Sequence, residues 1–440
     1  MCALPFSSKI STEMKQIRLG LVGAGVVGSN LLNLLDKKKA EIERLHQIQL
    51  QMHAIATRTP SKIAGLTKLS IGTDPLAVAN DPNVDILIEL MGGTTSALEV
   101  VQTALKNGKS VITANKALLS DYGDQIFQLA EEKGKFIGFE AAVAGSIPII
   151  RSLRNGLAAC DFEVVCGILN GTTNFILTKM EEENWDYEIA LKKAQELGFA
   201  EADPTFDVEG IDAAHKISLL ASLAFRNKIS FRQLSVEGIS KLKYIDITAC
   251  KSLGYRIKLL GIAKKYENGI LAKVHPTLIP LKHPLANVMN ESNAVFYKSQ
   301  EADAGMMTGK GAGGTPTASA VLSDIIYYGS KISEGSTKIE RNFFPPAQVP
   351  TPENNRVRYY LRFSTIDRPG VLSEIARILG KNNISIASVQ QKESESEPVN
   401  VIVVTHEAKE GDFQKSIQEI DDLKSLIKEK TVAIRLLEHL

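Results

Sequence analysis

Short apolar runs alternate with amphipathic helical runs along residues 15–140, a pattern typical of a doubly wound parallel sheet. Residues 17–22 form the first apolar run, and residues 29–35 follow it with helical spacing. The predicted strands of this region are 17–22, 51–57, 85–90, 110–113 and 135–139, and the predicted helices are 29–35, 96–107 and 117–133. We therefore expect an α/β domain in this part of the chain.

The regular alternation ends near Ser146. A predicted helix over 147–156 precedes a predicted strand over 163–169, so strands and helices no longer take strict turns. Helical spacing recurs at 175–182, 187–197, 217–225 and 317–328. The pattern indicates a second, α+β domain.

A proline-rich stretch, residues 344–352, separates these regions from the rest of the chain and is a stiff linker by composition. The predicted order beyond it is βαββαβ, which is ferredoxin-like. Its strands are 357–364, 384–391, 400–405 and 432–436, and its helices are 371–381 and 413–423. RNA-binding modules of this fold carry stacking aromatics on the third strand. Here that strand is Val-Ile-Val-Val at 401–404, so an RNA-binding role is not indicated.

A glycine motif joins the first predicted strand to the first predicted helix. It reads Gly23-Ala24-Gly25-Val26-Val27-Gly28. Glycines at this spacing allow a tight turn, close approach of a pyrophosphate, and close packing of the helix on the strand. Free N–H groups at the start of the helix then bind the phosphates. The motif predicts a dinucleotide site.

The end of the second predicted strand bears on which dinucleotide binds. An NAD-specific site usually has an acid there, which binds the ribose 2′-hydroxyl. This chain has Arg58 instead, and a guanidinium pairs well with a 2′-phosphate. Arg58 therefore favours NADP, and the alternative is an ordinary surface arginine.

Two further strand ends carry candidate chemistry. Gly92-Gly93-Thr94-Thr95 and Asn115-Lys116 each follow a predicted strand, where a doubly wound sheet binds its ligand. A cation is mildly unfavourable at a helix start, which favours a functional role for Lys116 over an ordinary surface lysine.

The segment Ala200–Lys216 is the most acidic part of the second domain. It contains Glu201, Asp203, Asp207, Glu209 and Asp212, and it ends in Lys216. Asp212 and Lys216 are four residues apart, so a helix places them on one face. Carboxylates suit a substrate ammonium, and a lysine suits an oxygen that gains charge. The alternative is a solvated helix start with acids near the positive end of the dipole.

Two loops add candidate ligand contacts. Asn170–Asn174 is rich in hydroxyls and amides, and it either binds a carboxylate or caps a helix. Gly309–Gly314 precedes the predicted helix 317–328, and its glycines favour close approach of backbone to a ligand over a flexible connector.

Composition excludes several function classes. The 440 residues carry a formal net charge of +1, so neither a nucleic-acid nor an anionic-membrane partner is indicated. The four cysteines are Cys2, Cys160, Cys166 and Cys250, and their spacing fits a reducing cytoplasm better than a disulfide scaffold. No apolar run is long enough to span a bilayer.

The segments together resemble the homoserine dehydrogenase family over roughly residues 15–335. The resemblance rests on the glycine motif, 113–116, 169–174, 200–216 and 311–321. It implies reversible reduction of L-aspartate 4-semialdehyde to L-homoserine with NADP or NAD, which serves threonine, methionine and isoleucine synthesis.

The resemblance also implies roles for single residues. Lys216 is the implied proton donor, Lys116 the second active-site lysine, and Asp212 the residue that orients Lys216. The implied substrate contacts are Glu201, Asp207, Asp212 and Thr172. The implied cofactor contacts are Gly23, Gly25, Val26, Val27, Gly28, Arg58, Thr94, Lys116, Gly198 and Gly314.

A structural monovalent cation, sodium or potassium, is a further implication of the resemblance. The family pattern matches the Glu140 side chain and the carbonyls of Val143, Gly145 and Ile147.

The carboxy-terminal region resembles an ACT domain on the strength of Asp367-Arg368-Pro369-Gly370 and Asn382-Asn383-Ile384-Ser385-Ile386. ACT domains usually bind amino acids across a pair of modules. The expected effector contacts are Asp367, Gly370, Asn383 and Ile384, with threonine as effector and a homodimer or homotetramer as assembly. A dimerisation module without a ligand is the alternative.

The expected domain organisation follows from these assignments. We expect an NAD(P)-binding Rossmann domain at 14–145, completed by 305–335, and a substrate-binding and dimerisation domain at 146–304. A linker at 336–355 then leads to an ACT domain at 356–440.

Two other functions compete with the enzyme. A non-catalytic amino-acid sensor has no need of Lys116, Glu201, Asp212 and Lys216 together. An aldehyde dehydrogenase acting on the semialdehyde needs a nucleophilic cysteine in the crevice, and Cys160 and Cys166 lie outside the lysine motifs.

Overall fold

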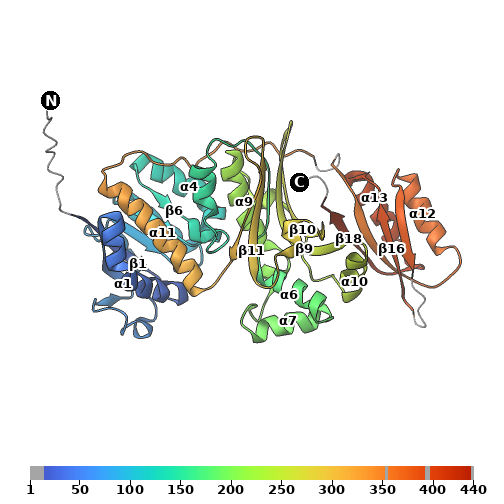
Figure 1. The fold of residues 1–440 in the computed structure, drawn as a ribbon, viewed down its shortest axis with the longest axis horizontal. Helices are drawn as coiled ribbons and strands as arrows, with labels where there is room; N and C mark the ends of the chain where they lie inside the picture. The colour runs from blue at the N-terminus through green and yellow to red at the C-terminus, as the bar shows by residue number, and fades with distance from the viewer. Residues whose placement is uncertain (1–13, 352–354, 392–396, 438–440) are drawn as a thin grey trace, which may run out of the picture. The chain divides into compact units, whose positions relative to one another are not determined.

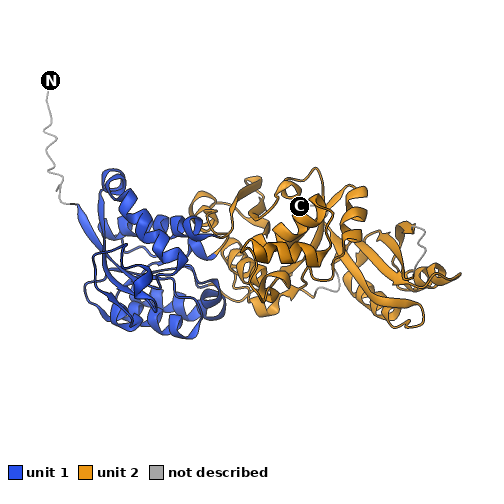
Figure 2. Ribbon diagram, turned by 90° about the horizontal axis from the view of Figure 1, so that it is seen from below, with its two compact units in different colours: residues 1–142, 313–343 blue, residues 143–312, 344–440 orange. Residues whose placement is uncertain are grey.

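A computed structural model describes residues 14–351, 355–391 and 397–437. The chain divides into two compact units (Figure 2). The first comprises residues 1–142 and 313–343, and the second comprises residues 143–312 and 344–440. The domain boundaries expected from the sequence stay a prediction.

A six-stranded parallel sheet forms the centre of the first unit, in the order β3-β2-β1-β4-β5-β6. This order is that of a Rossmann-type sheet and confirms the predicted fold class. The strands are β1 (Lys15–Val22), β2 (Ile48–Ala56), β3 (Ile71–Gly72), β4 (Ile86–Glu89), β5 (Ser110–Thr113) and β6 (Ile137–Gly138).

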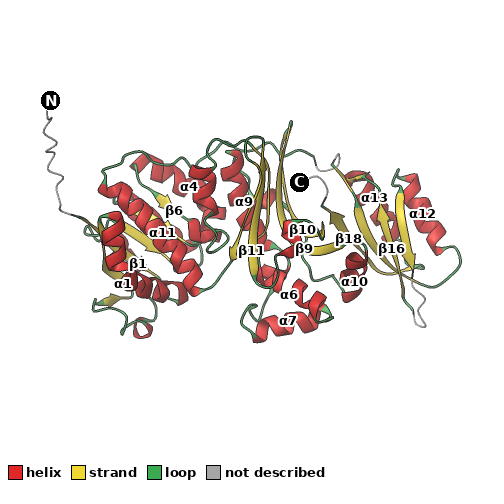
Figure 3. Ribbon diagram, in the orientation of Figure 1, coloured by secondary structure: helices red, strands yellow, loops and turns green. Residues whose placement is uncertain are grey.

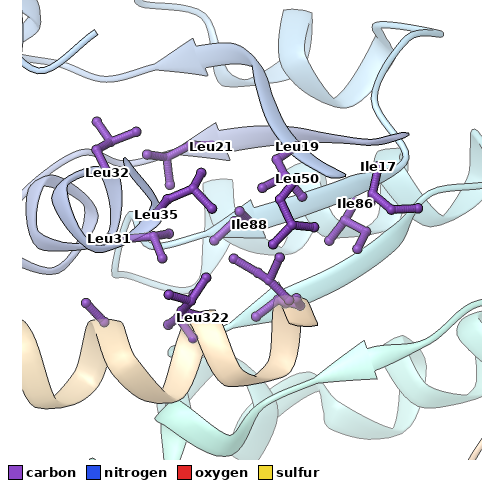
Figure 4. Packing of buried hydrophobic residues seen from close by; sticks show 14 of the residues in the cluster. Ile17, Leu19, Leu21, Leu31, Leu32, Leu35, Leu50, Ile86, Ile88 and Leu322 are labelled. Atoms are coloured by element: carbon purple, nitrogen blue, oxygen red, sulfur yellow. The ribbon is translucent and has the colours of Figure 1, made fainter. Parts of the chain in front are cut away.

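Helices cover both faces of this sheet. They are α1 (Val26–His46), α2 (Pro75–Asn80), α3 (Thr95–Lys106), α4 (Lys116–Lys133) and α11 (Gly314–Ser333), with short 3₁₀ turns at Pro60–Lys62 and Glu140–Ala142. Helices α1 and α11 lie side by side although about 270 residues separate them in sequence (Figure 1). Leu31, Leu32 and Leu35 of α1 and Leu322 of α11 meet strand residues such as Leu19 in one buried core (Figure 4).

A ten-stranded sheet runs through the second unit. Its main path is β12-β11-β7-β9-β10-β18-β14-β16-β15, and the short strand β8 pairs with β10 beside it. The strands are β7 (Phe162–Ile168), β8 (Ser235–Val236), β9 (Tyr255–Tyr266), β10 (Gly269–Pro280), β11 (Ser292–Ser299), β12 (Asp303–Lys310), β14 (Tyr359–Thr365), β15 (Ile386–Gln391), β16 (Val399–Thr405) and β18 (Ile427–Leu436). The four strands β9 to β12 were not predicted from the sequence.

Helices of the second unit pack on this sheet or on one another (Figure 3). They are α5 (Ile149–Arg151) with a π-helical turn at Ser152–Gly156, α6 (Gly171–Glu182), α7 (Tyr187–Glu196), α8 (Thr205–Val208), α9 (Ile211–Phe225), α10 (Tyr244–Ser252), α12 (Val371–Lys381) and α13 (Glu410–Asp421), with 3₁₀ turns at Phe231–Gln233 and Pro284–Asn287.

Several helix predictions need correction. The helices predicted at 29–35 and 317–328 are longer and span Val26–His46 and Gly314–Ser333. The helix predicted at 147–156 is one α-helical turn that continues as a π-helical turn, because Pro148 precedes it and Gly156 ends it. The helices predicted at 175–182 and 217–225 begin at Gly171 and Ile211, so the candidate site residues that precede the predicted starts are helical.

The carboxy-terminal strands confirm the ferredoxin-like prediction. Strands β18, β14, β16 and β15 pair antiparallel in that spatial order, which is the order 4-1-3-2 of a βαββαβ module. A short two-stranded ladder, β13 (Arg356–Val357) with β17 (Ala408–Lys409), lies beside the module.

This module is joined to the rest of the second unit by strand pairing and buried charge. Strand β10 pairs parallel with β18 at Thr277↔Arg435. Arg362 Nε of β14 donates to Asp246 Oδ1 of α10 at 2.7 Å, with both side chains buried. On Glu410, one oxygen accepts from Lys273 of β10 and the other from Arg435 at 2.8 Å.

The proline-rich segment also contacts this unit. The Lys228 N–H donates to Pro345 O at 2.7 Å, and the Ile270 N–H donates to Gln348 O at 2.9 Å. Its path is thus set by hydrogen bonds as well as by proline stiffness. Across the described ranges of the chain, no helix combines the length and apolarity that crossing a membrane requires.

Lys258 of β9 is buried, and its ammonium donates hydrogen bonds to uncharged groups. Its Nζ donates to Asn174 Oδ1 at 2.7 Å and to Val288 O at 2.6 Å. Burial lowers the pKa of Lys258 to about 7. Between pH 7 and pH 10 the unfolded chain therefore binds more protons at this position than the folded chain does.

We predict that stability rises with pH over this interval through Lys258. Relative to Lys258→Met, the free energy of unfolding of the unmodified chain should increase by up to about 1.4 kcal/mol per pH unit. Urea unfolding at pH 7 and pH 9 measures this difference, with Lys265→Met, exposed on the same strand, as the control. Identical pH dependence in all three proteins would contradict the prediction.

Candidate active site

A buried ion pair marks the centre of the candidate site in the second unit. Lys216 Nζ donates to Asp212 Oδ2 at 2.7 Å and to Leu169 O at 2.7 Å. Lys216 is 8% exposed and Asp212 is 3% exposed. The two residues lie one turn apart on α9, as the four-residue spacing predicted.

The local sequence explains where α9 begins. Gly210 has φ of +81°, a left-handed conformation that favours glycine. A Cβ at this position would lie 3.0 Å from the Val274 side chain. Gly210 thus allows a sharp turn into α9 directly against β10, and Asp212 follows in the first turn.

Asn170 connects the two acidic residues to the end of β7. Its Nδ2 donates to Asp207 Oδ1 at 2.7 Å and to Asp212 Oδ2 at 2.9 Å. Its Oδ1 accepts from the Thr173 N–H at 2.8 Å and so caps α6. The structure confirms that Asn170 caps a helix, and its side chain also holds the protein's own acidic residues; binding of a ligand carboxylate by the loop stays a prediction.

Thr172 and Asp207 complete the cluster. Thr172 Oγ1 lies 2.6 Å from Phe199 O and 3.1 Å from Asp207 Oδ2. Burial and then the charge of Asp212 raise the pKa of Asp207, while hydrogen bonds from Asn170 and Thr172 act in the opposite direction. The structure thus brings together four of the predicted residues: Thr172, Asp207, Asp212 and Lys216.

Glu201 and Gly198 lie on the adjoining segment. Glu201 is exposed, and its backbone carbonyl accepts from Gln195 Nε2 at 3.0 Å. Gly198 has φ of +76° and ends α7. The Glu201 carboxylate is outside the buried cluster and accessible to a ligand.

A groove of about 1000 Å³ lies at the carboxyl edge of the Rossmann-type sheet in the first unit. Its lining includes Gly23, Gly25, Arg58, Lys62 and Gly93. Gly23 has φ of +88°, and a Cβ there would lie 2.5 Å from the backbone of Leu90. Gly23 therefore allows a turn in which any side chain would clash with the backbone of Leu90.

Further cofactor candidates lie at the starts of helices α1, α3 and α11. A Cβ at Gly28 would lie 2.5 Å from Gly23 O, which explains the third glycine. Gly314 packs against the start of α1, since a Cβ on Gly314 would lie 2.8 Å from the Val26 side chain. Val26 and Val27 open α1, and Thr94 precedes α3.

Lys116 is the first residue of α4, in the first unit. Asn115 caps this helix by accepting from the Leu118 N–H at 3.0 Å. Sequence reasoning missed Glu89, which lies beside this strand end and accepts from Thr113 Oγ1 at 2.6 Å. The available signal was an acid that directly follows the apolar strand residues 86–88.

The residues matched to a cation site lie on one short stretch of chain. Glu140 is buried, and its N–H donates to Asp324 Oδ2 at 2.9 Å. Gly145 has φ of +59° and packs against the backbone of Gly311. Val143 and Ile147 are buried beside it in sequence. The described residues contain no cluster of three or more His, Cys, Asp or Glu side chains arranged for a metal ion.

The predicted effector residues fall at opposite ends of α12. Gly370 precedes the helix with φ of +93°, and the Asp367 N–H donates to Glu397 Oε1 at 3.1 Å. Asn383, with φ of +59°, and the buried Ile384 follow it. Eleven helical residues, roughly 16 Å, separate the two pairs, so a single module does not join them.

The cysteines give no support to an aldehyde dehydrogenase. Cys160, Cys166 and Cys250 are free and buried. Burial raises the pKa of the Cys166 and Cys250 thiols, which makes them poor nucleophiles. Cys2 lies outside the described residues.

A Rossmann-type sheet with a glycine-lined groove at its carboxyl edge defines a dinucleotide-binding protein. Family models match in three parts: the NAD-binding domain of homoserine dehydrogenase over 23–140, homoserine dehydrogenase over 148–326, and the ACT domain over 359–425. The chain belongs to the homoserine dehydrogenase family and is an NAD(P)-dependent oxidoreductase.

Curated relatives match nearly the full chain. Homoserine dehydrogenase of Pseudomonas aeruginosa is 41% identical over 421 residues, which are 94% of this chain and 97% of that protein. The enzyme of Bacillus subtilis is 37% identical over 424 residues, which are 93% of this chain and 96% of that protein.

Solved structures agree with these matches. A homoserine dehydrogenase from Thiobacillus denitrificans has a TM-score of 0.90 at 42% identity, covering 97% of this chain and 99% of that one. A hyperthermophilic archaeal homoserine dehydrogenase in complex with NADPH has a TM-score of 0.61 at 25% identity, covering 71% of this chain and 97% of that one.

Substitutions of Asn170 test separately its two roles, the cap of α6 and the hydrogen bonds to the acidic residues. Asn170→Ser keeps a capping oxygen but loses both amide donors to Asp207 and Asp212. We expect both variants to lose stability, because two carboxylates lose their donor, and to lose at least about tenfold in kcat. Asn170→Ala should lose about 1 kcal/mol more stability than Asn170→Ser, because it also loses the cap. Unchanged kcat in Asn170→Ser would contradict the arrangement.

Proposed function

We propose that this chain interconverts L-aspartate 4-semialdehyde and L-homoserine with NADP or NAD, as a step of threonine, methionine and isoleucine biosynthesis. The observation that carries the proposal is the buried Lys216–Asp212 pair, anchored on Leu169 O. Such a pair offers a positioned, positively charged donor in a site with little water.

Lys216 is the proposed general acid during reduction. The bound nicotinamide supplies the hydride, and the substrate carbonyl then becomes an alkoxide that needs a proton. Lys216 Nζ donates that proton, and Asp212 holds the ammonium in place by charge and hydrogen bonding. In the oxidative direction Lys216 takes the hydroxyl proton instead. Lys116 of the first unit is the proposed second lysine at the reacting centre.

The proposed substrate contacts use the polar groups of the acidic segment. Glu201 pairs with the substrate ammonium, because its carboxylate is exposed and charge-assisted contacts are strong. Asp207, Asp212 and Thr172 surround the position of Lys216 and orient the remaining polar atoms. The carboxylates and the lysine together offer partners for both the positive and the negative charge of a zwitterionic substrate.

The groove of the first unit is the proposed dinucleotide site. Gly23, Gly25, Val26, Val27 and Gly28 bind the pyrophosphate through backbone N–H groups at the start of α1. Further proposed contacts are Arg58, Thr94, Lys116, Gly198 and Gly314. The archaeal relative solved with NADPH supports a phosphorylated dinucleotide.

A monovalent cation, sodium or potassium, is proposed at the 140–147 segment. Glu140 brings a buried carboxylate, and Val143, Gly145 and Ile147 bring backbone carbonyls. These oxygen donors suit a hard cation. In this proposal the cation fixes the backbone of the 140–147 segment and takes no part in the reaction.

Threonine is the proposed effector of the ACT module, in a homodimer or homotetramer. Asp367 and Gly370 lie at one end of α12, and Asn383 and Ile384 lie at the other. A site shared between paired modules joins such separated residues, which supports assembly through the module.

Lys216 gives the most direct prediction about the chemistry. Lys216→Ala should lower kcat by about 10²- to 10⁴-fold, the usual loss for a general acid, with a smaller change in the KM for homoserine. Steady-state rates at the nicotinamide absorbance measure both constants. Lys192→Ala, at an exposed lysine on α7, is the control and should match the unmodified enzyme. A kcat of Lys216→Ala within about threefold of the unmodified enzyme would contradict the role of Lys216 as general acid.

Arg58 gives a prediction about cofactor preference. A guanidinium pairs with a 2′-phosphate and has no such partner on NAD. Arg58→Ala should raise the KM for NADP by about tenfold or more and leave the KM for NAD nearly unchanged. Initial rates with each cofactor test this, and equal effects on both would refute the assignment.

Regulation is best tested on the full chain, because β18 pairs with β10 and a truncated protein would lose that strand. We predict that threonine lowers the turnover of the unmodified enzyme and that Asp367→Ala weakens this inhibition without changing uninhibited kcat. A typical coupling of 1–3 kcal/mol corresponds to a change of about 5- to 150-fold in affinity. Calorimetry that shows no heat with threonine would leave the module as a dimerisation element.

A further inference from the structure

Glu89 places a fully buried carboxylate at the edge of the groove. It is the last residue of β4 and is 0% exposed. One oxygen accepts from the Met91 N–H at 2.8 Å, and the other accepts from Thr113 Oγ1 at 2.6 Å. Its partners are donors from two neighbouring strand ends, so a single side chain ties β4 to β5.

The contacts of Glu89 continue into a closed ring of hydrogen bonds. Thr113 Oγ1, which donates to Glu89, also accepts from the Asn115 N–H at 3.0 Å. Asn115 Nδ2 donates to Gly93 O at 2.6 Å, and Gly93 lies two residues beyond Met91. The ring therefore runs from Glu89 through Thr113 and Asn115 to the 91–93 turn and back.

This ring borders the parts of the fold that face a dinucleotide. Gly92 and Gly93 have φ of +76° and +72°, and both line the groove. A Cβ on Gly23 would lie 2.6 Å from Met91 N, so the turn after β4 packs directly on the glycine motif. At its other end, Asn115 caps α4 and so fixes the backbone of Lys116.

Burial of a carboxylate at this position is energetically unfavourable, so a purely structural packing role would be better filled by an apolar side chain. Burial raises the pKa of Glu89, and the donors from Thr113, Met91 and Gly92 oppose that shift. Desolvating a carboxylate is unfavourable unless hydrogen bonds replace the water. The N–H and O–H groups that converge here need a side chain that only accepts hydrogen bonds, as a carboxylate does. A glutamine would instead turn its own N–H₂ group toward one of these donors.

We propose that Glu89 is a positioning residue for the reaction, which holds the 91–93 turn and the start of α4 in the geometry that the dinucleotide and Lys116 need. Glu89 does not touch the reacting atoms in this proposal. It acts through Met91 and Gly93 on the cofactor and through Thr113 and Asn115 on Lys116. The proposal rests on the assignment of the groove as the dinucleotide site.

The test compares Glu89→Gln with Asp85→Asn. Asp85 precedes β4 at the opposite edge of the sheet, where it accepts from Arg18. Both substitutions turn a carboxylate into an amide and remove charged hydrogen bonds, but only one touches the turn. NADPH fluorescence gives the dissociation constant, steady-state rates give kcat and KM, and calorimetric melting gives the loss of stability.

We expect Glu89→Gln to raise the NADPH dissociation constant and to lower kcat, each by about 10- to 100-fold. Asp85→Asn should lose less stability, because its carboxylate is partly exposed, and should keep both values within about twofold. Thr113 supplies a second pair in case Glu89→Gln fails to fold: Thr113→Ser keeps the hydroxyl and should keep activity, and Thr113→Val should follow Glu89→Gln.

The proposal is overturned if Glu89→Gln and Thr113→Val lose stability but bind NADPH and turn over as Asp85→Asn does. Gly25→Val, which fills the groove, tests the assignment on which the proposal rests. Unchanged NADPH binding in Gly25→Val would overturn the groove assignment. Lost binding there with normal binding in Glu89→Gln would overturn the role of Glu89 alone.

Discussion

The buried ion pair of Lys216 and Asp212 is the interaction on which the candidate site depends. Two charges removed from water are costly, and they persist only where hydrogen bonds satisfy both. Leu169 O receives the second hydrogen bond of Lys216, and Asn170 donates to Asp212. The end of β7, the cap of α6 and the start of α9 must therefore meet at one point, and the second unit is built so that they do.

The second unit carries its ferredoxin-like module as part of one sheet. Strand β18 pairs with β10, and Arg362 reaches Asp246 on α10. Loss of the module would deprive Asp246 and Lys273 of their ionic partners, Arg362 and Glu410. Arg435 also pairs with Glu237, whose N–H donates to Val274 O of β10. The module thus contributes to the stability of the unit as well as to any regulation.

Local signals in the sequence account for much of the fold. The glycine motif predicted a turn whose positive φ at Gly23 the structure confirms, and the βαββαβ order was predicted from periodicity alone. Strands β9 and β10 escaped prediction because residues on both of their faces are buried, which removes the alternation that marks a strand. From sequence alone, such a strand cannot be distinguished from a buried helical segment of similar composition.

The candidate site was predictable where spacing along one helix decides it, as with Asp212 and Lys216. Contacts between distant segments were not predictable in the same way. Asn170 joins residues about 40 positions away, and Glu89 accepts from Thr113 on the neighbouring strand. In sequence Glu89 is only an acid after an apolar run, and its role depends on which donors the sheet brings to it.

Chemical rescue of Lys216→Ala is the measurement that tests the central claim most directly. Removing the side chain leaves space beside Asp212 that a small primary amine fills, so methylamine or ethylamine should restore part of the lost turnover. The account predicts a rate that rises with amine concentration and depends on amine basicity, with no rescue of Lys216→Met, whose side chain fills the space. A folded Lys216→Ala enzyme that binds NADPH normally and gains nothing from either amine would contradict proton transfer by Lys216.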